Sequence, residues 1–227
     1  MKVLTWNLGF WQHTSNHDRA WAYLREQVAP DLALLQEVST VRPQSCENIL
    51  FKQIHQNWGT ALYAQNLTLE PFTLETDQPN RVVAAVLKIQ DNQDIIAMSI
   101  HAPIVKGYVF PHLNEIFDRI EEAISGKTFI VGGDLNTARL AEKVWPNHGH
   151  GQFFERLSKS IFFDCFRKFH VFEEQTYFRN NSKWPFQDDH LFVSHDLADR
   201  VKSCYVLNND FTRSLSDHIP VVAEINI

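Results

Sequence analysis

Short apolar segments that end in a polar side chain recur along the 227 residues of the chain. They are too short and too rich in β-branched residues for helices, so they predict buried strands. The expected strands cover residues 2–6, 31–36, 60–64, 81–89, 95–100, 129–131, 176–178, 191–194, 201–207 and 221–225. Helices are expected over residues 17–28, 46–55, 113–124 and 153–157. The alternation of strands and helices along the chain predicts an α/β fold in one domain that spans residues 1–227.

One strand leads directly into polar groups, in the stretch Phe129-Ile130-Val131-Gly132-Gly133-Asp134-Leu135-Asn136. We expect the strand to stop at the glycine pair and Leu135 to point back into the core. In an extended turn, Asp134 and Asn136 would lie on the same side, because side chains two apart share a face. An Asx-rich turn explains the same residues. Partners from elsewhere in the chain must decide between the two interpretations.

A polar, proline-bearing segment joins the strands expected at residues 60–64 and 81–89, which suggests an antiparallel part of the sheet. Apolar residues make up 44% of the chain and charged residues 21%, as is typical of a protein with a substantial core. The formal net charge of -6 argues against a broadly cationic nucleic-acid binder. A local basic rim is compatible with that charge.

The three cysteines, Cys46, Cys165 and Cys204, are widely spaced and form no Cys-x-x-Cys pair. This predicts neither a disulfide framework nor a zinc site, and it fits a reducing compartment. The chain enters a strand at its first residues and contains no apolar run of about 18 residues. We therefore expect a cytoplasmic, monomeric protein without stable membrane insertion.

Polar residues gather at the expected strand ends. They are Asn7, Glu37, His101, Asp134, Asn136, Asp189, Asp217 and His218. One such residue alone is usually a solvated turn residue, but a set drawn from distant segments indicates a shared site, because ligand groups of α/β sheets lie at strand ends. These side chains suit attack of water on a phosphate ester, which needs a hard cation, an activated water and donors for developing charge.

Oxygen ligands without thiols favour Mg²⁺, with Mn²⁺ or Ca²⁺ as alternatives, over Zn²⁺. Glu37, Asp217 and the amide oxygen of Asn7 are the candidate ligands. His218 suits a general base or a cationic phosphate contact, and a carboxylate such as Asp189 would fix its tautomer and raise its pKa. Asp134 competes with His218 for the role of base. Rival chemistries lack their motifs, since the chain contains no Gly-x-x-x-x-Gly-Lys loop, Gly-x-Ser-x-Gly elbow or His-Glu-x-x-His helix.

The ordered set resembles the endonuclease/exonuclease/phosphatase superfamily, in particular the pancreatic deoxyribonuclease-like metal-dependent phosphohydrolases. The resemblance covers essentially the whole chain and rests on Thr5-Trp6-Asn7, Leu35-Gln36-Glu37, Ser99-Ile100-His101, Gly133-Asp134-Leu135-Asn136, Asp189-His190-Leu191-Phe192-Val193-Ser194 and Ser216-Asp217-His218-Ile219-Pro220-Val221. It implies a four-layered α/β sandwich, with two mixed β-sheets packed face to face and helices on the outer faces.

The resemblance also implies roles for individual residues. Glu37 resembles the main metal ligand, with Asn7 and Asp217 supporting the metal or the phosphate. Asp134 resembles the residue that aligns or activates water. Asn136 resembles a contact to the phosphate and the leaving group.

His218 resembles a phosphate contact or base that is paired with Asp189. We choose Asp189 over Asp188 because the family's Asp stands five residues before a Ser, here Ser194. The implied catalytic set is His101, Asp134, Asn136, Asp189 and His218. The implied substrate contacts are Asn7, Asn136, His101 and Arg81.

Two positions depart from the family pattern. His101 resembles the deoxyribonuclease branch, where its partner is a Glu before an Arg in a strand, whereas here Asn80 precedes Arg81. The position two after Asn7 is Gly9 rather than an acidic residue, so a second metal is less expected.

Three groups near the motifs bear on the substrate. Trp145, in the loop at residues 145–151, suits stacking on a base, with His148 or His150 suiting a phosphate contact, and an ordinary flexible loop is the alternative. For Trp184 and Phe186, core packing is the better interpretation. Lys106, Arg139, Arg179, Lys183 and Arg213 form either a local basic rim or ordinary surface charge.

We therefore expect a Mg²⁺-dependent phosphodiester hydrolase, a nuclease that acts on DNA or RNA by metal-assisted attack of an activated water on phosphorus. The enzymatic alternative is a phosphomonoesterase or a phospholipid phosphodiesterase, such as an inositol-phosphate phosphatase or a sphingomyelinase-like enzyme. A non-catalytic binding module is the third possibility.

Overall fold

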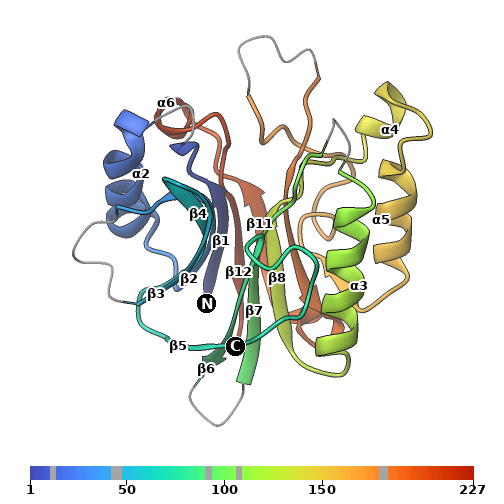
Figure 1. The fold of residues 1–227 in the computed structure, drawn as a ribbon, viewed down its shortest axis with the longest axis horizontal. Helices are drawn as coiled ribbons and strands as arrows, with labels where there is room; N and C mark the ends of the chain where they lie inside the picture. The colour runs from blue at the N-terminus through green and yellow to red at the C-terminus, as the bar shows by residue number, and fades with distance from the viewer. Residues whose placement is uncertain (11–13, 42–47, 90–93, 106–108, 179–183) are drawn as a thin grey trace.

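The computed structural model describes residues 1–10, 14–41, 48–89, 94–105, 109–178 and 184–227. These residues form two mixed six-stranded sheets that pack face to face (Figure 1). The first sheet has the order β11 (Val201–Val206), β12 (Val221–Ile225), β1 (Lys2–Asn7), β2 (Leu32–Ser39), β4 (Trp58–Ala64) and β3 (Ile49–His55). The second sheet has the order β5 (Thr68–Pro71), β6 (Val82–Lys88), β7 (Asp94–His101), β8 (Phe129–Asp134), β10 (Asp189–Ser194) and β9 (Phe162–Asp164).

Helices cover the outer face of each sheet, so the fold is the four-layered α/β sandwich that was predicted (Figure 1). Against the first sheet lie α2 (His17–Tyr23), the π-helical turn η2 (Leu24–Val28) and α6 (Asp210–Leu215). Against the second sheet lie α3 (His112–Ile124) and α5 (His150–Ser158), with α4 (Ala141–Val144) just before α5. The 3-10 turns η1 (Thr14–Asn16) and η4 (His195–Arg200) precede α2 and β11. None of the described helices has the length and apolarity that a bilayer crossing requires.

The strands are continuously apolar because their two faces serve different cores. In β2, Leu34 packs between the sheets, whereas Leu35 packs against the helices of the first sheet. In β8, Ile130 packs between the sheets and Val131 lies beneath α3 and α5. Since side chains alternate across a strand, covering both faces requires runs of consecutive apolar residues.

Two β-α-β units place strand ends at one edge of each sheet. Strands β1 and β2 are parallel and flank α2 in the sequence, and β7 and β8 are parallel and flank α3. The carboxyl ends of these four strands carry candidate site residues that sequence analysis selected. They are Asn7, Glu37, His101 and Asp134. Strand β10 runs antiparallel to β8, so its first residue lies at the edge where β8 ends.

Two predictions about local structure are wrong because tertiary pairing decides them. The described part of the helix expected over residues 46–55 is strand β3, in which Leu50 faces the other sheet and Phe51 faces the opposite side. Cys46 lies outside the described residues. The expected strand over residues 176–178 is reduced to one bridge, from Tyr177 to His218.

The glycine pair does not end its strand, contrary to the prediction, because β8 continues to Asp134. The strands expected at 60–64 and 81–89 are also not neighbours in one sheet. Strand β4 belongs to the first sheet and β6 to the second, and the segment between them contributes the edge strand β5. Among the described residues, Cys165 and Cys204 are free and buried.

Candidate active site

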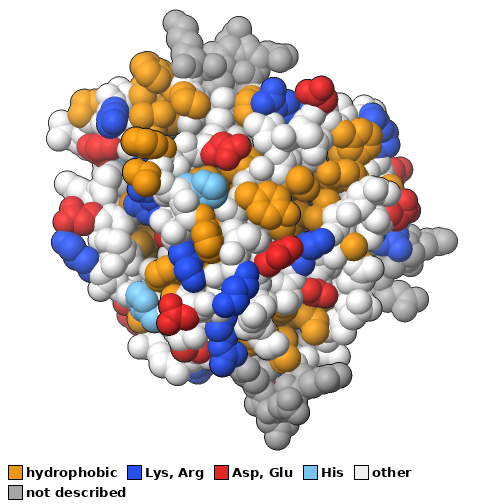
Figure 2. All heavy atoms as spheres, turned by 180° about the vertical axis from the view of Figure 1, so that it is seen from behind, with side chains coloured by type: hydrophobic (Ala, Val, Ile, Leu, Met, Phe, Trp, Pro, Cys, Tyr) orange, Lys and Arg blue, Asp and Glu red, His pale blue; other side chains and the backbone are white. Residues whose placement is uncertain are grey.

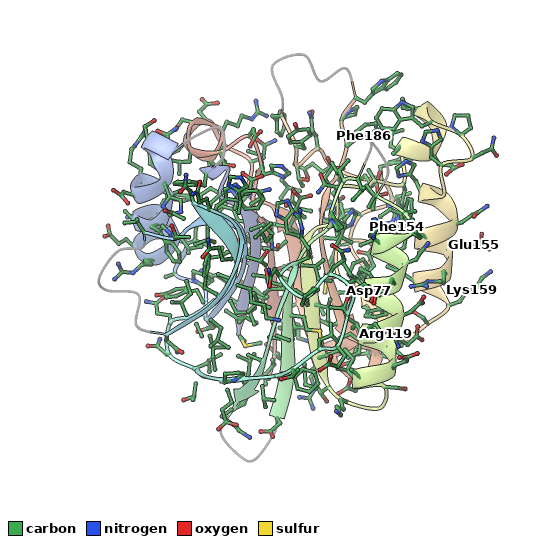
Figure 3. All side chains as sticks on the ribbon, in the orientation of Figure 1. Asp77, Arg119, Phe154, Glu155, Lys159 and Phe186 are labelled. Atoms are coloured by element: carbon green, nitrogen blue, oxygen red, sulfur yellow. The ribbon has the colours of Figure 1, made fainter. Side chains whose placement is uncertain are left out.

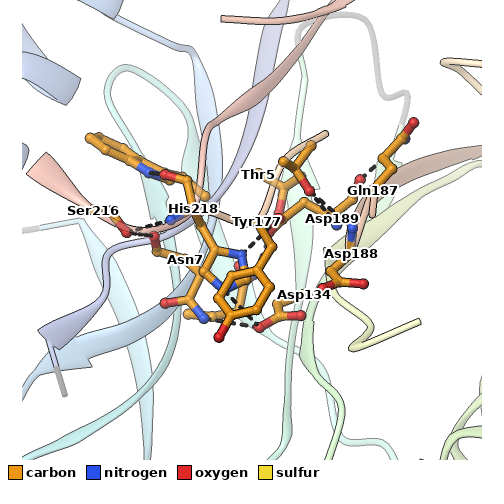
Figure 4. A network of polar contacts seen from close by, with 12 residues as sticks. Thr5, Asn7, Asp134, Tyr177, Gln187, Asp188, Asp189, Ser216 and His218 are labelled. Carbon is orange, nitrogen blue, oxygen red and sulfur yellow. Dashed lines mark hydrogen bonds and ion pairs between the residues drawn. The ribbon is translucent and has the colours of Figure 1, made fainter. Parts of the chain in front are cut away.

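The register of the strands brings the predicted residues into two facing rows. In the second sheet, Asp134 is paired with His101 of β7 on one side and with Asp189 of β10 on the other. In the first sheet, Asn7 is paired with Gln36, and His218 stands three residues before β12. Hydrogen bonds then join the rows across the interface of the sheets (Figure 4).

Asp134 lies at the centre of this arrangement and is 2% exposed. Its Oδ2 accepts a hydrogen bond from Asn7 Nδ2 at 2.9 Å, and its Oδ1 accepts one from the Asn136 N–H at 2.9 Å. His101 Nε2 and His218 Nε2 lie 3.7 and 3.8 Å from Oδ2. Burial raises the pKa of the Asp134 carboxyl to about 7, against the opposing effects of His218 and the two hydrogen bonds.

The hydrogen bond from the Asn136 N–H to Asp134 Oδ1 forms an Asx turn. The Asx-turn interpretation of this stretch is therefore correct, and the turn is part of the candidate site. Leu135 is fully buried, as expected. The turn is not extended, however, because Asn136 has a φ of 51° in the left-handed region that Asn tolerates. Its side-chain amide donates to the Ala102 carbonyl at 2.9 Å. This fixes the amide beside the Asp134 turn.

His218 and Asp189 form the predicted pair. His218 Nδ1 donates to Asp189 Oδ2 at 2.8 Å, and both side chains are buried. Burial alone would lower the pKa of His218, but the charges of Asp189 and Asp134 hold it well above its usual value. The imidazole therefore carries a positive charge near neutral pH, with Nε2 on the side of Asp134.

Several contacts hold the His218 segment in place. The Trp6 indole N–H donates to the His218 carbonyl at 2.9 Å, and Ser216 Oγ donates to the Asn7 carbonyl at 2.8 Å. Tyr177 packs over the His218 ring with 4.7 Å between the ring centroids (Figure 4). Sequence analysis missed this tyrosine, whose single-residue bridge to His218 has no periodic signal.

His101 is buried against the Trp58 ring, with 5.5 Å between centroids. Burial, together with Arg81 and His218, lowers its pKa well below the usual value. The ring is therefore neutral near neutral pH. Arg81 lies close enough to contribute to this lowering of the pKa, and the backbone N–H of His101 donates to the Arg81 carbonyl at 2.9 Å.

Glu37 reaches the site because β2 contains a bulge. The pairing of β2 with β4 shifts between Leu35 and Val38, and Glu37 has a φ of 49°. A bulge re-aims side chains that strict alternation would send to the other face. Burial lowers the pKa of Arg81, and the charges of Asp134 and Glu37 counter this effect, so the guanidinium lies near both carboxylates.

The other members of the predicted set occupy the same edge. Asn7 is 1% exposed, and its Oδ1 accepts the Gly9 N–H at 3.0 Å while its amide nitrogen donates to Asp134. Asp217 is 9% exposed, and its charge contributes to the raised pKa of His218. Its carbonyl accepts the Phe178 N–H at 2.7 Å. All nine predicted site residues thus lie at one edge of the sandwich.

Asp188, which sequence analysis passed over, is a further buried carboxyl at this site (Figure 4). Burial raises its pKa to about 8, and the charges of Asp134 and Asp189 act in the same direction. The N–H groups of Asp188 and Asp189 both donate to Thr176 Oγ1, at 3.0 and 3.1 Å. The Asp188-Asp189 doublet was the available sequence signal, and only one of the two was chosen.

The side chains present fit a divalent metal. Among the described residues, Asp134, Asp189 and His218 each offer a ligand atom within 4.8 Å of the other two. Asp189 Oδ1 is buried without a hydrogen-bond partner among them. Since a buried carboxylate oxygen needs a compensating group, this atom is suited to a cation. The donor set is rich in oxygen and lacks thiolate, as hard cations prefer.

The cations considered for a basic rim differ in their surroundings. Arg139 is bound to Asp164 at 2.8 Å and stacks on Phe154, so it is a structural residue. Arg213 stacks on the Phe178 ring at 4.8 Å and donates to Asn208. Lys106, Arg179 and Lys183 lie outside the described residues. Phe186 is buried as expected, whereas Trp184 is 46% exposed and so departs from the expected core packing.

Comparisons with known proteins agree with this fold. An AP endonuclease from Archaeoglobus fulgidus aligns with a TM-score of 0.78 at 18% identity, over 100% of both chains. A 3'-5' exonuclease from Neisseria meningitidis aligns with a TM-score of 0.79 at 19% identity, also over 100% of both chains. The endonuclease domain of TRAS1, a telomere-specific non-LTR retrotransposon, aligns with a TM-score of 0.72 at 19% identity, over 100% of this chain and 98% of that domain. At such identities these likenesses show the fold.

A search of curated protein sequences finds no match. The model of the Endonuclease/Exonuclease/phosphatase family matches residues 4–218, a span that includes every predicted site residue. The chain therefore belongs to the Endonuclease/Exonuclease/phosphatase family.

Proposed function

We propose that this protein is a metal-dependent phosphodiesterase, a nuclease that hydrolyses DNA or RNA, with residues 1–227 as one catalytic domain. The observation that carries the proposal is the buried Asp134 carboxylate, hydrogen-bonded by Asn7 and the Asn136 N–H and 3.8 Å from the cationic His218. Family membership supports phosphate-ester hydrolysis, and so do the structural neighbours, which include an AP endonuclease, a 3'-5' exonuclease and a 3' phosphatase from Neisseria bound to product DNA hairpin.

Asp134 is the base in this proposal. Its two hydrogen bonds fix the direction of the carboxylate, and a pKa of about 7 suits proton transfer near neutral pH. It would accept a proton from the attacking water. His218 is already protonated through its contact with Asp189, so it binds a phosphate oxygen as a cation and stabilises the charge that develops on phosphorus.

The remaining residues position the phosphate. Arg81 supplies a second positive charge near Asp134 and Glu37, and neutral His101 supplies a hydrogen-bond donor. Asn136 lies where its amide can contact the leaving group. Glu37, Asn7 and Asp217, together with the buried Oδ1 of Asp189, would hold the metal, which we propose is Mg²⁺, with Mn²⁺ as a substitute. When bound, the cation would neutralise phosphate charge and acidify a water.

A substrate panel tests the proposal. Wild-type protein is incubated with single-stranded and duplex DNA, RNA, bis(4-nitrophenyl) phosphate, an inositol phosphate and sphingomyelin vesicles, each with Mg²⁺ and with EDTA. We expect Mg²⁺-dependent hydrolysis of the diesters and the nucleic acids. Turnover confined to the inositol phosphate or to the vesicles would support the alternative enzymes. No turnover on any substrate would contradict a catalytic role.

Two variants test the assigned groups. Asp134→Ala and His218→Ala should each lower kcat on a diester by at least about 10²-fold, the scale of one acid-base or electrostatic contribution. Glu155→Ala is the control, because it removes an exposed carboxylate on α5 that pairs with Lys159 (Figure 3). Circular dichroism checks that all three variants fold. Rates within threefold of wild type in both site variants would refute the assignment.

A further inference from the structure

Trp145 presents an exposed aromatic ring at the end of α4 and is 45% exposed. The buried side of the indole packs on Phe186, with 5.3 Å between centroids and 49° between planes. It also contacts the His150 ring at 6.2 Å. Figure 3 places Phe186 beside α4 at the top of the molecule, and Figure 2 shows hydrophobic side chains gathered on the surface at this corner, its upper left. The ring is therefore supported from behind and open in front.

The residues that pack behind Trp145 are connected to two segments of the candidate site, the start of β10 and the end of β8. Phe186 stands three residues before Asp189, and its carbonyl accepts the Thr176 N–H at 3.0 Å. The same Thr176 accepts the N–H groups of Asp188 and Asp189. These contacts fix the indole relative to the β10 part of the site.

A second connection leads to the end of β8. His150 Nδ1 is hydrogen-bonded to Thr137 Oγ1 at 2.7 Å, and Thr137 directly follows Asn136. The Thr137 carbonyl contacts His190 Nε2 at 3.0 Å. Through His150, these contacts fix the indole relative to the end of β8, where Asn136 lies.

The loop around Trp145 is ordered by its own contacts. Glu142 accepts the N–H groups of Asn147 and Gly151, which ties the start of α4 to the start of α5. Each of its two carboxylate oxygens accepts one of these bonds. Because the ring is held in place before binding, stacking on it costs little conformational entropy.

The charge of the chain favours such a contact. With a net charge of -6, the protein gains little general attraction for a phosphate backbone. Stacking of a base on an aromatic ring supplies affinity that requires no positive charge, and every base has a face that can stack. A base inside a duplex has both faces covered by its neighbours, so only an unpaired or terminal base is available.

We propose that Trp145 stacks on an unpaired nucleobase of the strand whose phosphate is bound by His218. The inference rests on the proposed nuclease function and adds a substrate class to it: single strands, or duplex ends at which a base has left the stack. Phosphate contacts place the strand, and the indole selects strands that have a free base near the scissile bond.

The test uses short single strands that carry 2-aminopurine at one position at a time, because the fluorescence of this base falls when it stacks. Binding is measured in EDTA, so that no strand is cleaved. We expect quenching at one position or two adjacent positions with the wild-type protein. Trp145→Ala should abolish this position-specific quenching and raise Kd about 10-fold. Trp145→Phe should retain most of the quenching and most of the affinity.

Tyr205→Ala is the matched control, since Tyr205 is an exposed aromatic residue on β11 of the other sheet. It should bind and quench like the wild type. With Mg²⁺, the ratio of kcat/KM on a single strand to that on a blunt duplex should fall about 10-fold in Trp145→Ala. Unchanged quenching and an unchanged ratio in folded Trp145→Ala would overturn the inference, as would equal losses in Tyr205→Ala.

Hydrolysis of bis(4-nitrophenyl) phosphate by the wild type distinguishes failure of the stacking inference from failure of the proposed function. If the wild type cleaves this baseless diester but Trp145→Ala behaves like wild type on strands, the stacking inference alone fails. If the wild type cleaves no diester, the proposed function fails, whatever the binding data show.

Discussion

Asp189 sets the charge of His218 through a 2.8 Å hydrogen bond in a site from which water is largely excluded. Since the pKa of His218 is raised, the ring stays protonated until the pH rises well above its usual titration range. Replacing Asp189 by Asn keeps the shape of the acceptor and removes the charge. His218 should then lose its proton at a lower pH than in the wild type.

NMR titration of the imidazole resonances checks this expectation, with exposed His195 as an internal reference in both proteins. We expect the midpoint for His218 to move downward in Asp189→Asn. The rate on a diester at pH 7 should fall by at least about 10²-fold. A His218 midpoint equal to that of the wild type would show that another group charges the ring.

Asp188 is costly to the fold at alkaline pH because its carboxyl is buried. Its folded pKa of about 8 lies above the ordinary aspartate value of 3.8, so the folded state binds a proton that the unfolded state has released. The stability associated with this group is fully present below the unfolded pKa and is lost as the pH rises towards about 8.

Asp188→Asn should therefore raise Tm in EDTA, with a gain that grows from pH 5 to pH 8. We expect at least about 1 kcal/mol at pH 8, or about 2–4 °C for a chain of this size. Asp77→Asn, on the exposed segment after β5 (Figure 3), is the control and should change Tm little at either pH. A gain of the same size at both pH values would point to packing rather than charge.

At the scale of the elements, β8 depends on its two glycines. A Cβ at Gly133 would lie 1.8 Å from the Ile100 carbonyl oxygen, and one at Gly132 would lie 2.4 Å from that of His190. Both obstacles are backbone atoms of paired strands, which cannot move without opening the sheet. The glycines therefore allow β7, β8 and β10 to approach, and this approach aligns His101, Asp134 and Asp189 in one row.

Gly133→Ala should destabilise the protein by more than about 3 kcal/mol, as overpacking against rigid backbone does in severe cases. Gly126→Ala is the control, because Gly126 also has a positive φ but a Cβ there meets nothing within 4 Å. We expect about 1–2 kcal/mol for it, the cost of a left-handed alanine. Urea denaturation measures both, and equal losses would show that the close approach is not what requires the glycine.

The elements also show which features a sequence can predict. The helix α3 and the strands buried on both faces have strong periodic or continuous apolar patterns, and they lie where expected. β3 has no such pattern, because Leu50 and Phe51 serve opposite faces of an edge strand whose residues are all partly or fully exposed. Pairing with β4 decides its conformation, and single-sequence periodicity cannot express such a pairing.

For the whole molecule, the resemblance anticipated the layers and the residues at the strand ends, because ordered motifs carry that information. It did not anticipate how Glu37 enters the site, since a bulge with a left-handed residue leaves no mark in the composition of β2. The raised pKa of His218 agrees with its predicted pairing with Asp189. The protonation state of His101 was out of reach, because it depends on burial and on Arg81 lying near the ring after folding.

The candidate site is divided between the two sheets. Asn7 and Glu37 come from the first sheet, and His218 precedes one of its strands, whereas His101, Asp134 and Asp189 come from the second. The Asn7–Asp134, Gln36–Ser99 and His218–Asp189 hydrogen bonds cross between the sheets. A sliding of one sheet over the other by a fraction of a residue would break these contacts and leave every strand intact. We therefore expect the catalytic rate to depend on the relative position of the two sheets.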